Sequence, residues 1–288
     1  MSGEAIANFV AFTGASPQEA TMFLEMSGGN VQIAVELFFG GGAAGGGGAA
    51  SSSSNTANNQ AAELPPWFRI VWGLKRSEPV PVSWLEQPLE FSGSSVGPYA
   101  QFGLVQKKNG PCGVLAALNA VLLAQVRKHH SFSSTNQLSN ADLTAAIVRV
   151  MRSTLVAAEA TGNARLRIAT WKDGPPSSAS VTQRRQAGQH VEGIVFTDVK
   201  QEDAVEFVSQ HLPHYVGPGG LLLIVYTCVR THPGGVKAVE REIRSSGGEP
   251  PMIFGPFTLC TSELLSLMLR GSGDGNVSVR VMLCHSLF

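Results

Sequence analysis

A segment from Gly40 to about Ala62, made almost entirely of glycine, alanine, serine and asparagine, divides this chain of 288 residues into a short and a long part. A segment of that composition has too little apolar surface to offset the entropy lost on ordering, so it predicts a flexible tether. We therefore expect a small domain at residues 1–42, a linker at residues 43–63 and a large domain at residues 64–288.

The short N-terminal part has the apolar spacing of three helices. Ser16 to Glu19 form a capping box with Pro17 at the first helical position, which predicts the start of the second helix. Gly28 to Asn30 end that helix and begin a third one, which ends at Gly40. The expected apolar positions are Ile6, Phe9, Val10, Ala20, Phe23, Leu24, Ala34, Leu37 and Phe38.

The charge balance argues against nucleic-acid and membrane partners. Lys and Arg total 21, as do Asp and Glu, so no net charge draws the protein to nucleic acid or to an anionic membrane. The first residues lack the basic segment and long apolar run of a signal peptide. The longest apolar run, Leu221 to Val229, is about half as long as a helix that crosses a bilayer.

The four cysteines are scattered along the chain, at Cys112, Cys228, Cys260 and Cys284. They form no Cys-x-x-Cys pair and have no histidine at the spacing of a zinc site, so we expect neither a metal nor another cofactor. Scattered thiols of this kind are typical of reduced cysteines in a cytoplasmic or nuclear protein, and we expect a monomer.

The large domain has patterns of both helices and strands. Helices are expected at residues 112–127, from the capping box Ser139–Asp142 onward, at 202–212 and at 261–270, and strands are expected after Ala164, at 191–196 and at 221–229. Because these elements mix without a regular βαβ alternation, the sequence predicts the α+β class.

Cys112 has the local setting of a catalytic nucleophile. It follows Asn109-Gly-Pro111, which predicts a buried helix from about Cys112 with Pro111 at its start, so that Cys112 lies in the first turn. Unpaired N–H groups and the helix dipole favour negative charge at such a position. They therefore favour the thiolate, which is the form of cysteine that attacks.

The residues around Cys112 extend this interpretation. Gln106 lies six residues upstream, a spacing that allows its amide to donate to an oxyanion that forms above the thiolate. Lys107 and Lys108 add positive potential nearby, and Gly110 and Gly113 leave the backbone open to an approaching carbonyl. From the residues alone, a small buried cysteine beside a solvated glutamine is an equally good interpretation.

The segment from Phe102 to Leu123 resembles the active-site segment of the MINDY family of deubiquitinases, in the branch with the longer catalytic domain. Residues 190–196, 215–223 and 255–271 are similar to that family in the same order, and the resemblance covers about Pro66 to Val279. It implies a papain-related cysteine peptidase fold that hydrolyses isopeptide bonds in polyubiquitin of the proteasome-targeting lysine linkage. It also implies that Cys112 is the nucleophile and that Gln106 lies in the oxyanion hole.

The N-terminal part resembles UBA-like domains at residues 12–17 and 30–39. Such domains often bind ubiquitin through the loop after the first helix and the end of the third. The resemblance therefore implies that Thr13, Gly14 and Leu37 contact ubiquitin. The alternative is that Leu37 and Phe38 pack the small core.

The chain departs from the family in its histidines. A thiol peptidase needs an imidazole that takes the thiol proton and later protonates the leaving amine. The family's Ser-His-Phe/Tyr-Ser-Val motif has no counterpart here, and the similarity stops near Asn276. No general base is therefore assigned among the seven histidines, His129, His130, His190, His211, His214, His232 and His285.

Two hypotheses follow from this departure. In the first, the chain is a deubiquitinase that is truncated at its C-terminus relative to the family and lacks the general-base histidine. In the second, it is a catalytically incomplete protein that binds ubiquitin. A third and weaker hypothesis is a different cysteine amidase. With a truncated domain, we expect Leu221 to Val229 to lack partners and to leave an exposed apolar patch.

Overall fold

The computed structural model describes residues 3–13, 15–26, 34, 38, 63–92, 103–108, 110–129, 138–155, 165–183, 185–255 and 258–276. The chain forms two compact units, Met1–Asn59 and Gln60–Phe288. Of the predicted linker at residues 43–63, only Glu63 is among the described residues.

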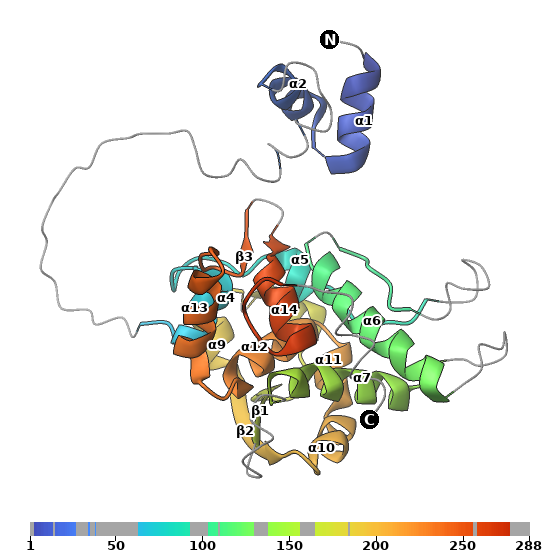
Figure 1. Cartoon of the computed structure of the whole chain (residues 1–288), viewed down its shortest axis with the longest axis vertical. Coiled ribbons are helices and arrows are strands. Elements are labelled where there is room, and N and C mark those ends of the chain that lie inside the picture. Colours follow the sequence, from blue (N-terminus) through green and yellow to red (C-terminus); the bar gives the residue numbers. More distant parts are fainter. Residues whose placement is uncertain are drawn as a thin grey trace, which may run out of the picture. The chain divides into compact units, whose positions relative to one another are not determined.

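The N-terminal unit is built on α1 (Gly3–Thr13) and α2 (Pro17–Met26) (Figure 1). The predicted capping box is confirmed, because the Ser16 N–H donates to Glu19 Oε2 at 2.9 Å and the Glu19 N–H donates to Ser16 Oγ at 3.3 Å. Phe38, which is helical, packs its ring against Phe9 and Phe23, with centroids 5.3 and 5.0 Å apart. Apart from Ala34 and Phe38, the predicted third helix lies outside the described residues.

The large unit combines helices with two small antiparallel sheets, which agrees with the α+β prediction. Its elements are α4 (Pro66–Trp72), α5 (Val82–Leu85), α6 (Cys112–His129), α7 (Asn140–Arg152), β1 (Arg165–Trp171), α8 (Ser178–Gln183), α9 (Ala187–Glu192), β2 (Ile194–Lys200), α10 (Ala204–Gln210), α11 (Leu212–Val216), α12 (Gly220–Thr231), α13 (Gly235–Ser245), β3 (Ile253–Phe254), β4 (Leu259–Cys260) and α14 (Ser262–Arg270). Strand β1 pairs with β2 from Arg165–Lys200 to Trp171–Ile194, and β3 pairs with β4.

The segment Leu221–Val229 is a helix, so the predicted strand is wrong. It forms most of α12, which contacts β1, α4, α7, α11, α13 and α14 (Figure 1). All residues from 221 to 229 are buried, so the expected apolar patch is also wrong for this segment. A continuous apolar run is compatible with a buried strand or with a helix that is covered on all sides, and periodicity does not separate the two.

Side chains from the helices cover the edge of β1 that does not pair with β2. Thr231 Oγ1 accepts from the Arg167 N–H at 3.0 Å, and Thr227 Oγ1 accepts from the Ala169 N–H at 2.9 Å. The Tyr215 hydroxyl donates to the Ala169 carbonyl at 3.1 Å. Backbone groups that a further strand would satisfy are thus satisfied by side chains, so this edge of β1 can be buried without a third strand.

Two other predicted boundaries need correction. The strand expected at residues 191–196 begins only at Ile194, because residues 190–192 form the end of α9 and Gly193 turns the chain. The helix expected at residues 202–212 is shorter, and α11 follows it with Pro213 in its first turn. The capping box at Ser139 and the helix from Ser262 to Arg270 are as predicted.

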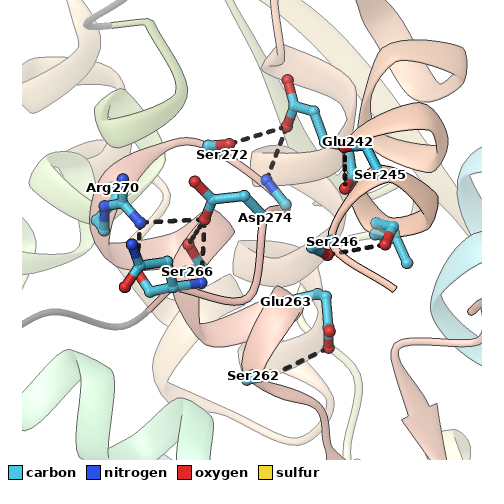
Figure 2. A network of polar contacts seen from close by, with 12 residues as sticks. Glu242, Ser245, Ser246, Ser262, Glu263, Ser266, Arg270, Ser272 and Asp274 are labelled. Carbon is cyan, nitrogen blue, oxygen red and sulfur yellow. Dashed lines mark hydrogen bonds and ion pairs between the residues drawn. The ribbon is translucent and has the colours of Figure 1, made fainter. Parts of the chain in front are cut away.

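A polar network fixes the chain after α14 (Figure 2). Asp274 Oδ1 accepts from the Ser266 hydroxyl at 2.7 Å and from Arg270 Nη1 at 3.0 Å. Burial tends to raise the pKa of Asp274, but these partners and the N–H of Asn276 outweigh it and hold the pKa below its usual value. Glu242 accepts from the Gly273 N–H at 2.7 Å, which ties the same segment to α13.

The turn after α14 yields a stability prediction. Gly271 ends α14 with φ 79°, and a Cβ atom there would overlap the carbonyl oxygen of Ser153. Gly271→Ala is expected to lower the free energy of unfolding by about 3 kcal/mol, the sum of left-handed backbone strain and the displacement of packed backbone. Gly247→Ala is the control, because Gly247 has φ 87° and nothing within 4 Å of its Cβ position. It should cost only about 1 kcal/mol in a urea titration. Equal losses in the two variants would contradict the packing argument.

Candidate active site

Cys112 is the first residue of α6, as the sequence predicts, and its side chain is exposed. Pro111 before it is buried, and the Leu115 N–H donates to the Pro111 carbonyl at 3.0 Å, which closes the first turn. The Cys112 sulfur lies 3.8 Å from the Gly110 carbonyl oxygen. The thiol is therefore open to solvent at the N-terminal end of a helix whose other side packs against α7 and α14.

Two side-chain amides hold the loop that leads to Cys112. Gln87 is fully buried, and its Oε1 accepts from the Lys107 and Lys108 N–H groups at 2.8 and 3.0 Å. Its Nε2 donates to the carbonyl of Val105 at 3.0 Å. Asn119 of α6 accepts from the Leu104 N–H at 2.7 Å. Sequence patterns do not reveal these roles, because each contact joins residues 15 to 21 positions apart in the chain.

Gln106 lies in this loop and is exposed. Its Nε2 donates to the Lys108 carbonyl at 2.9 Å, and within the described residues no hydrogen bond joins it to Cys112. The amide is thus near Cys112 along the chain, but it is turned toward its own loop.

The positive charges of Lys107 and Lys108 are compensated by neighbouring carboxylates. Lys107 forms an ion pair with Glu90, and Lys108 Nζ lies 2.8 Å from Glu86 Oε2. A neighbouring carboxylate cancels most of each charge, so the field at Cys112 comes mainly from the helix start.

The space over Gly113 is filled, which corrects the expectation that it leaves the backbone open. A Cβ atom at Gly113 would lie 2.5 Å from the Cys260 sulfur and 3.1 Å from Leu265. Burial and the neighbouring Cys112 thiol raise the pKa of Cys260, while the N–H groups of Val114, Gly113 and Cys260 itself lower it. The glycine therefore admits a second thiol to the first turn of α6.

His190 is buried within the core. Its Nε2 lies 3.1 Å from the Tyr226 hydroxyl oxygen, which also accepts from the Trp72 indole N–H at 2.8 Å. Burial lowers the pKa of His190 to about 3, so its imidazole is neutral at physiological pH.

The other described histidines also have partners away from Cys112. His211 Nδ1 lies 2.8 Å from the Phe207 carbonyl oxygen, His214 Nδ1 accepts from the Trp171 N–H at 3.1 Å, and His232 Nε2 lies 3.2 Å from Glu242 Oε1. His129 ends α6, about 25 Å from Cys112 at 1.5 Å per residue. Among the described residues no histidine hydrogen-bonds to Cys112, and His130 and His285 lie outside them.

In the N-terminal unit, Thr13 is only 9% exposed. Its hydroxyl donates to the Phe9 carbonyl at 2.6 Å and accepts from the Ala15 N–H at 3.2 Å, so it closes the end of α1. Gly14 and Leu37 lie outside the described residues. Ubiquitin contact by these three residues stays a prediction.

The described ranges contain neither a candidate metal cluster nor a helix that could span a membrane. Those ranges contain no group of three or more His, Cys, Asp or Glu side chains that could hold a metal ion. No helix there is both long enough and apolar enough to cross a bilayer.

Comparison with known families matches both units. Residues 3–45 match a UBA-like domain, and residues 69–281 match the conserved domain of the deubiquitinating enzymes MINDY-3/4. No solved structure matches the chain.

Curated relatives named probable ubiquitin carboxyl-terminal hydrolase MINDY-4 are similar to the chain. The protein from Xenopus tropicalis is 27% identical over 183 residues, which is 62% of this chain and 23% of the relative. The human protein is 24% identical over 216 residues, which is 68% of this chain and 27% of the relative. The chain thus spans about a quarter of the length of the curated relatives that it matches.

The buried amide of Gln87 yields a prediction for the loop. Gln87→Leu removes the acceptor of two N–H groups, so amide exchange at Lys107 and Lys108 should become faster by about tenfold or more, at roughly 1 kcal/mol per lost hydrogen bond. Hydrogen exchange with mass spectrometry measures this effect. Gln183→Leu, at an exposed position in α8, is the control and should leave the loop unchanged. Unchanged exchange in Gln87→Leu would show that Gln87 does not hold the loop.

His190 yields a prediction for pH dependence. Between pH 6.5 and about 3 the unfolded chain binds a proton at this residue that the folded chain does not, so stability falls as pH decreases. The expected slope from this group reaches about 1.4 kcal/mol per pH unit. His214, whose pKa is lowered by burial and by His211, adds to it in the same direction. Urea titrations at pH 7.5 and pH 5 should give a smaller difference for His190→Gln than for the unaltered chain. Equal differences would refute the assignment.

Proposed function

Because the chain belongs to the MINDY-3/4 family of deubiquitinating enzymes, we propose that its large unit is a cysteine-type deubiquitinase that hydrolyses isopeptide bonds in polyubiquitin. The observation that carries the proposal is the exposed thiol of Cys112 at the first position of α6, within the matched domain. The preference for the proteasome-targeting lysine linkage rests on the family resemblance.

In this proposal Cys112 attacks the isopeptide carbonyl and the helix start stabilises the thiolate. The oxyanion that develops needs donors, and the Cys112 N–H is suited to supply one. Other donors at the helix start are taken, because those of Val114 and Gly113 point to the Cys260 sulfur and that of Leu115 bonds to Pro111. Gln106 supplies the second donor once its amide turns away from Lys108.

The leaving lysine amine needs a proton, and a histidine general base is the usual source. Four of the described histidines have partners elsewhere and His129 lies at the far end of α6, so in this proposal the group comes from outside the described residues. A fold of the papain-related kind remains part of the proposal.

We propose that the N-terminal unit binds ubiquitin, since it matches a UBA-like domain. A ubiquitin-binding unit on a deubiquitinase raises the local concentration of chain substrates through the intervening segment.

A second candidate function is a catalytically incomplete protein that binds polyubiquitin without cutting it. The observation that favours it is that no described histidine hydrogen-bonds to Cys112. Both functions require ubiquitin binding, and only the first requires a reactive thiol.

A ubiquitin probe with a C-terminal electrophile separates the two functions. We expect the full chain to form a covalent adduct, seen as a band shift on a denaturing gel, and Cys112→Ala to form none. Gln106→Ala should keep the adduct but slow hydrolysis of a ubiquitin dimer by about 100-fold, the cost of one oxyanion donor. Cys228→Ser, at a buried thiol, is the control for cysteine loss. Binding without an adduct supports the incomplete protein, and neither binding nor adduct would exclude both functions.

A further inference from the structure

Cys260 lies against the turn that carries Cys112. The Cys260 sulfur fills the space over Gly113 and receives the N–H groups of Gly113 and Val114. A sulfur in contact with Gly113 is one residue away from Cys112, and consecutive Cα atoms are about 3.8 Å apart. The Cys260 thiol also interacts electrostatically with Cys112, so it is the neighbouring thiol from which a disulfide with Cys112 could form.

The core holds Cys260 in this position. Met252 donates to the Ile70 carbonyl at 2.9 Å, which ties the β3–β4 segment to α4. The buried Trp84 indole N–H lies 3.0 Å from both oxygens of Thr258, a residue held at φ 51°. This backbone conformation is uncommon for threonine and persists only when the surroundings enforce it. The strand that ends in Cys260 is therefore fixed from several sides.

The two thiols differ in their access to solvent. Cys112 is exposed, Cys260 is half-buried and Cys228 is fully buried. A dissolved oxidant therefore reaches Cys112 first.

We propose that Cys260 is a resolving thiol that forms a reversible disulfide with Cys112 after a hydroperoxide oxidises the nucleophile. In the first step the Cys112 thiolate attacks one oxygen of hydrogen peroxide, the O–O bond breaks, and a sulfenic acid and hydroxide form. In the second step the Cys260 sulfur attacks the sulfenic sulfur, the S–O bond breaks, and water leaves with the Cys260 proton. Cys112 and the peroxide thus exchange two electrons in the first step, and a dithiol reductant later restores both thiols.

The surroundings of Cys260 set the order of these steps. Burial and the charge of the nearby Cys112 raise the pKa of Cys260, so the Cys260 thiol competes less well for the peroxide. The neutral sulfenic acid removes that repulsion. The N–H groups of Gly113 and Val114 then favour the Cys260 thiolate that resolves it.

The disulfide would protect the nucleophile. A sulfenic acid that meets no thiol goes on to sulfinic and sulfonic acids, which thiols do not reduce. With Cys260 beside it, oxidised Cys112 instead forms a disulfide, which a reductant converts back to the thiol.

The test uses the full chain and hydrogen peroxide. After treatment, free thiols are blocked with N-ethylmaleimide and the protein is digested without reductant for mass spectrometry. We expect a cross-linked pair of the Cys112 and Cys260 peptides, lighter by two hydrogen atoms than the reduced peptides together. Dithiothreitol should remove the pair and restore alkylation of Cys112. This result needs only an accessible thiol, so it stands or fails independently of ubiquitin hydrolysis.

The variants sharpen the outcome. Cys260→Ser should lose the pair and accumulate sulfinic and sulfonic acid at Cys112 several-fold faster, without recovery in dithiothreitol. Cys284→Ser is the matched control and should behave as the unaltered chain. The proposal is overturned if Cys112 overoxidises equally fast with and without Cys260, or if it pairs with Cys284 instead. The cross-link in the unaltered chain decides the question even where Cys260→Ser folds poorly, which circular dichroism would show.

Discussion

Burial of α12 is the constraint on which the large unit depends. Residues Leu221 to Val229 have no exposed surface, so every element around them has to supply an apolar face. Burial of this extent is the main favourable contribution to folding, at about 25 cal/mol per Å² of apolar surface. Four buried polar side chains of α12 each have a hydrogen-bond partner, as a buried polar group requires. Thr227 and Thr231 bond to β1, Tyr226 to Trp72 and His190, and the Cys228 thiol to the Val150 carbonyl.

The packing around α12 also holds the candidate site in place. α12 contacts α7 and α14, and both of these helices pack against α6, which presents Cys112. On the other side of the site, Gln87 and Asn119 attach the loop before Cys112 to buried structure. A nucleophile is effective when its surroundings hold it within a fraction of an ångström, and the packing around Cys112 suits the role that we propose for it. The side chain that is not so held is Gln106, which is exposed and has to turn before it can serve an oxyanion.

Local signals in the sequence predicted the parts of the fold that depend on local interactions. The capping boxes at Ser16 and Ser139 and the end of α14 at Arg270 follow from contacts within one helical turn, and they are found as predicted. The start of α6 at Cys112 has the same origin. The secondary structure predicted for Leu221–Val229 is wrong. A segment that is buried on all sides has no polar face, so the spacing of its apolar residues does not distinguish a helix from a strand. The same limit applies to the site, where Gln87 contacts Lys107 across 20 positions in the sequence and Cys260 reaches Gly113 from a distant strand.

The electrostatic potential around Cys112 depends on which N–H groups at the start of α6 already have an acceptor. The lysines before Cys112 have carboxylate partners, so the helix start is the main source of positive potential. Of its donors, those of Gly113 and Val114 face the Cys260 sulfur and that of Leu115 faces Pro111. Among the described residues the Cys112 N–H has no acceptor, so in the proposed reaction it is the donor that is free for a substrate oxyanion. The sulfur of Cys260 therefore limits which N–H groups at the helix start can bind another acceptor. The sulfur accepts from the Gly113 and Val114 N–H groups, which would otherwise bind water or an anion beside Cys112. The Cys112 N–H is left as the donor that the proposed reaction uses.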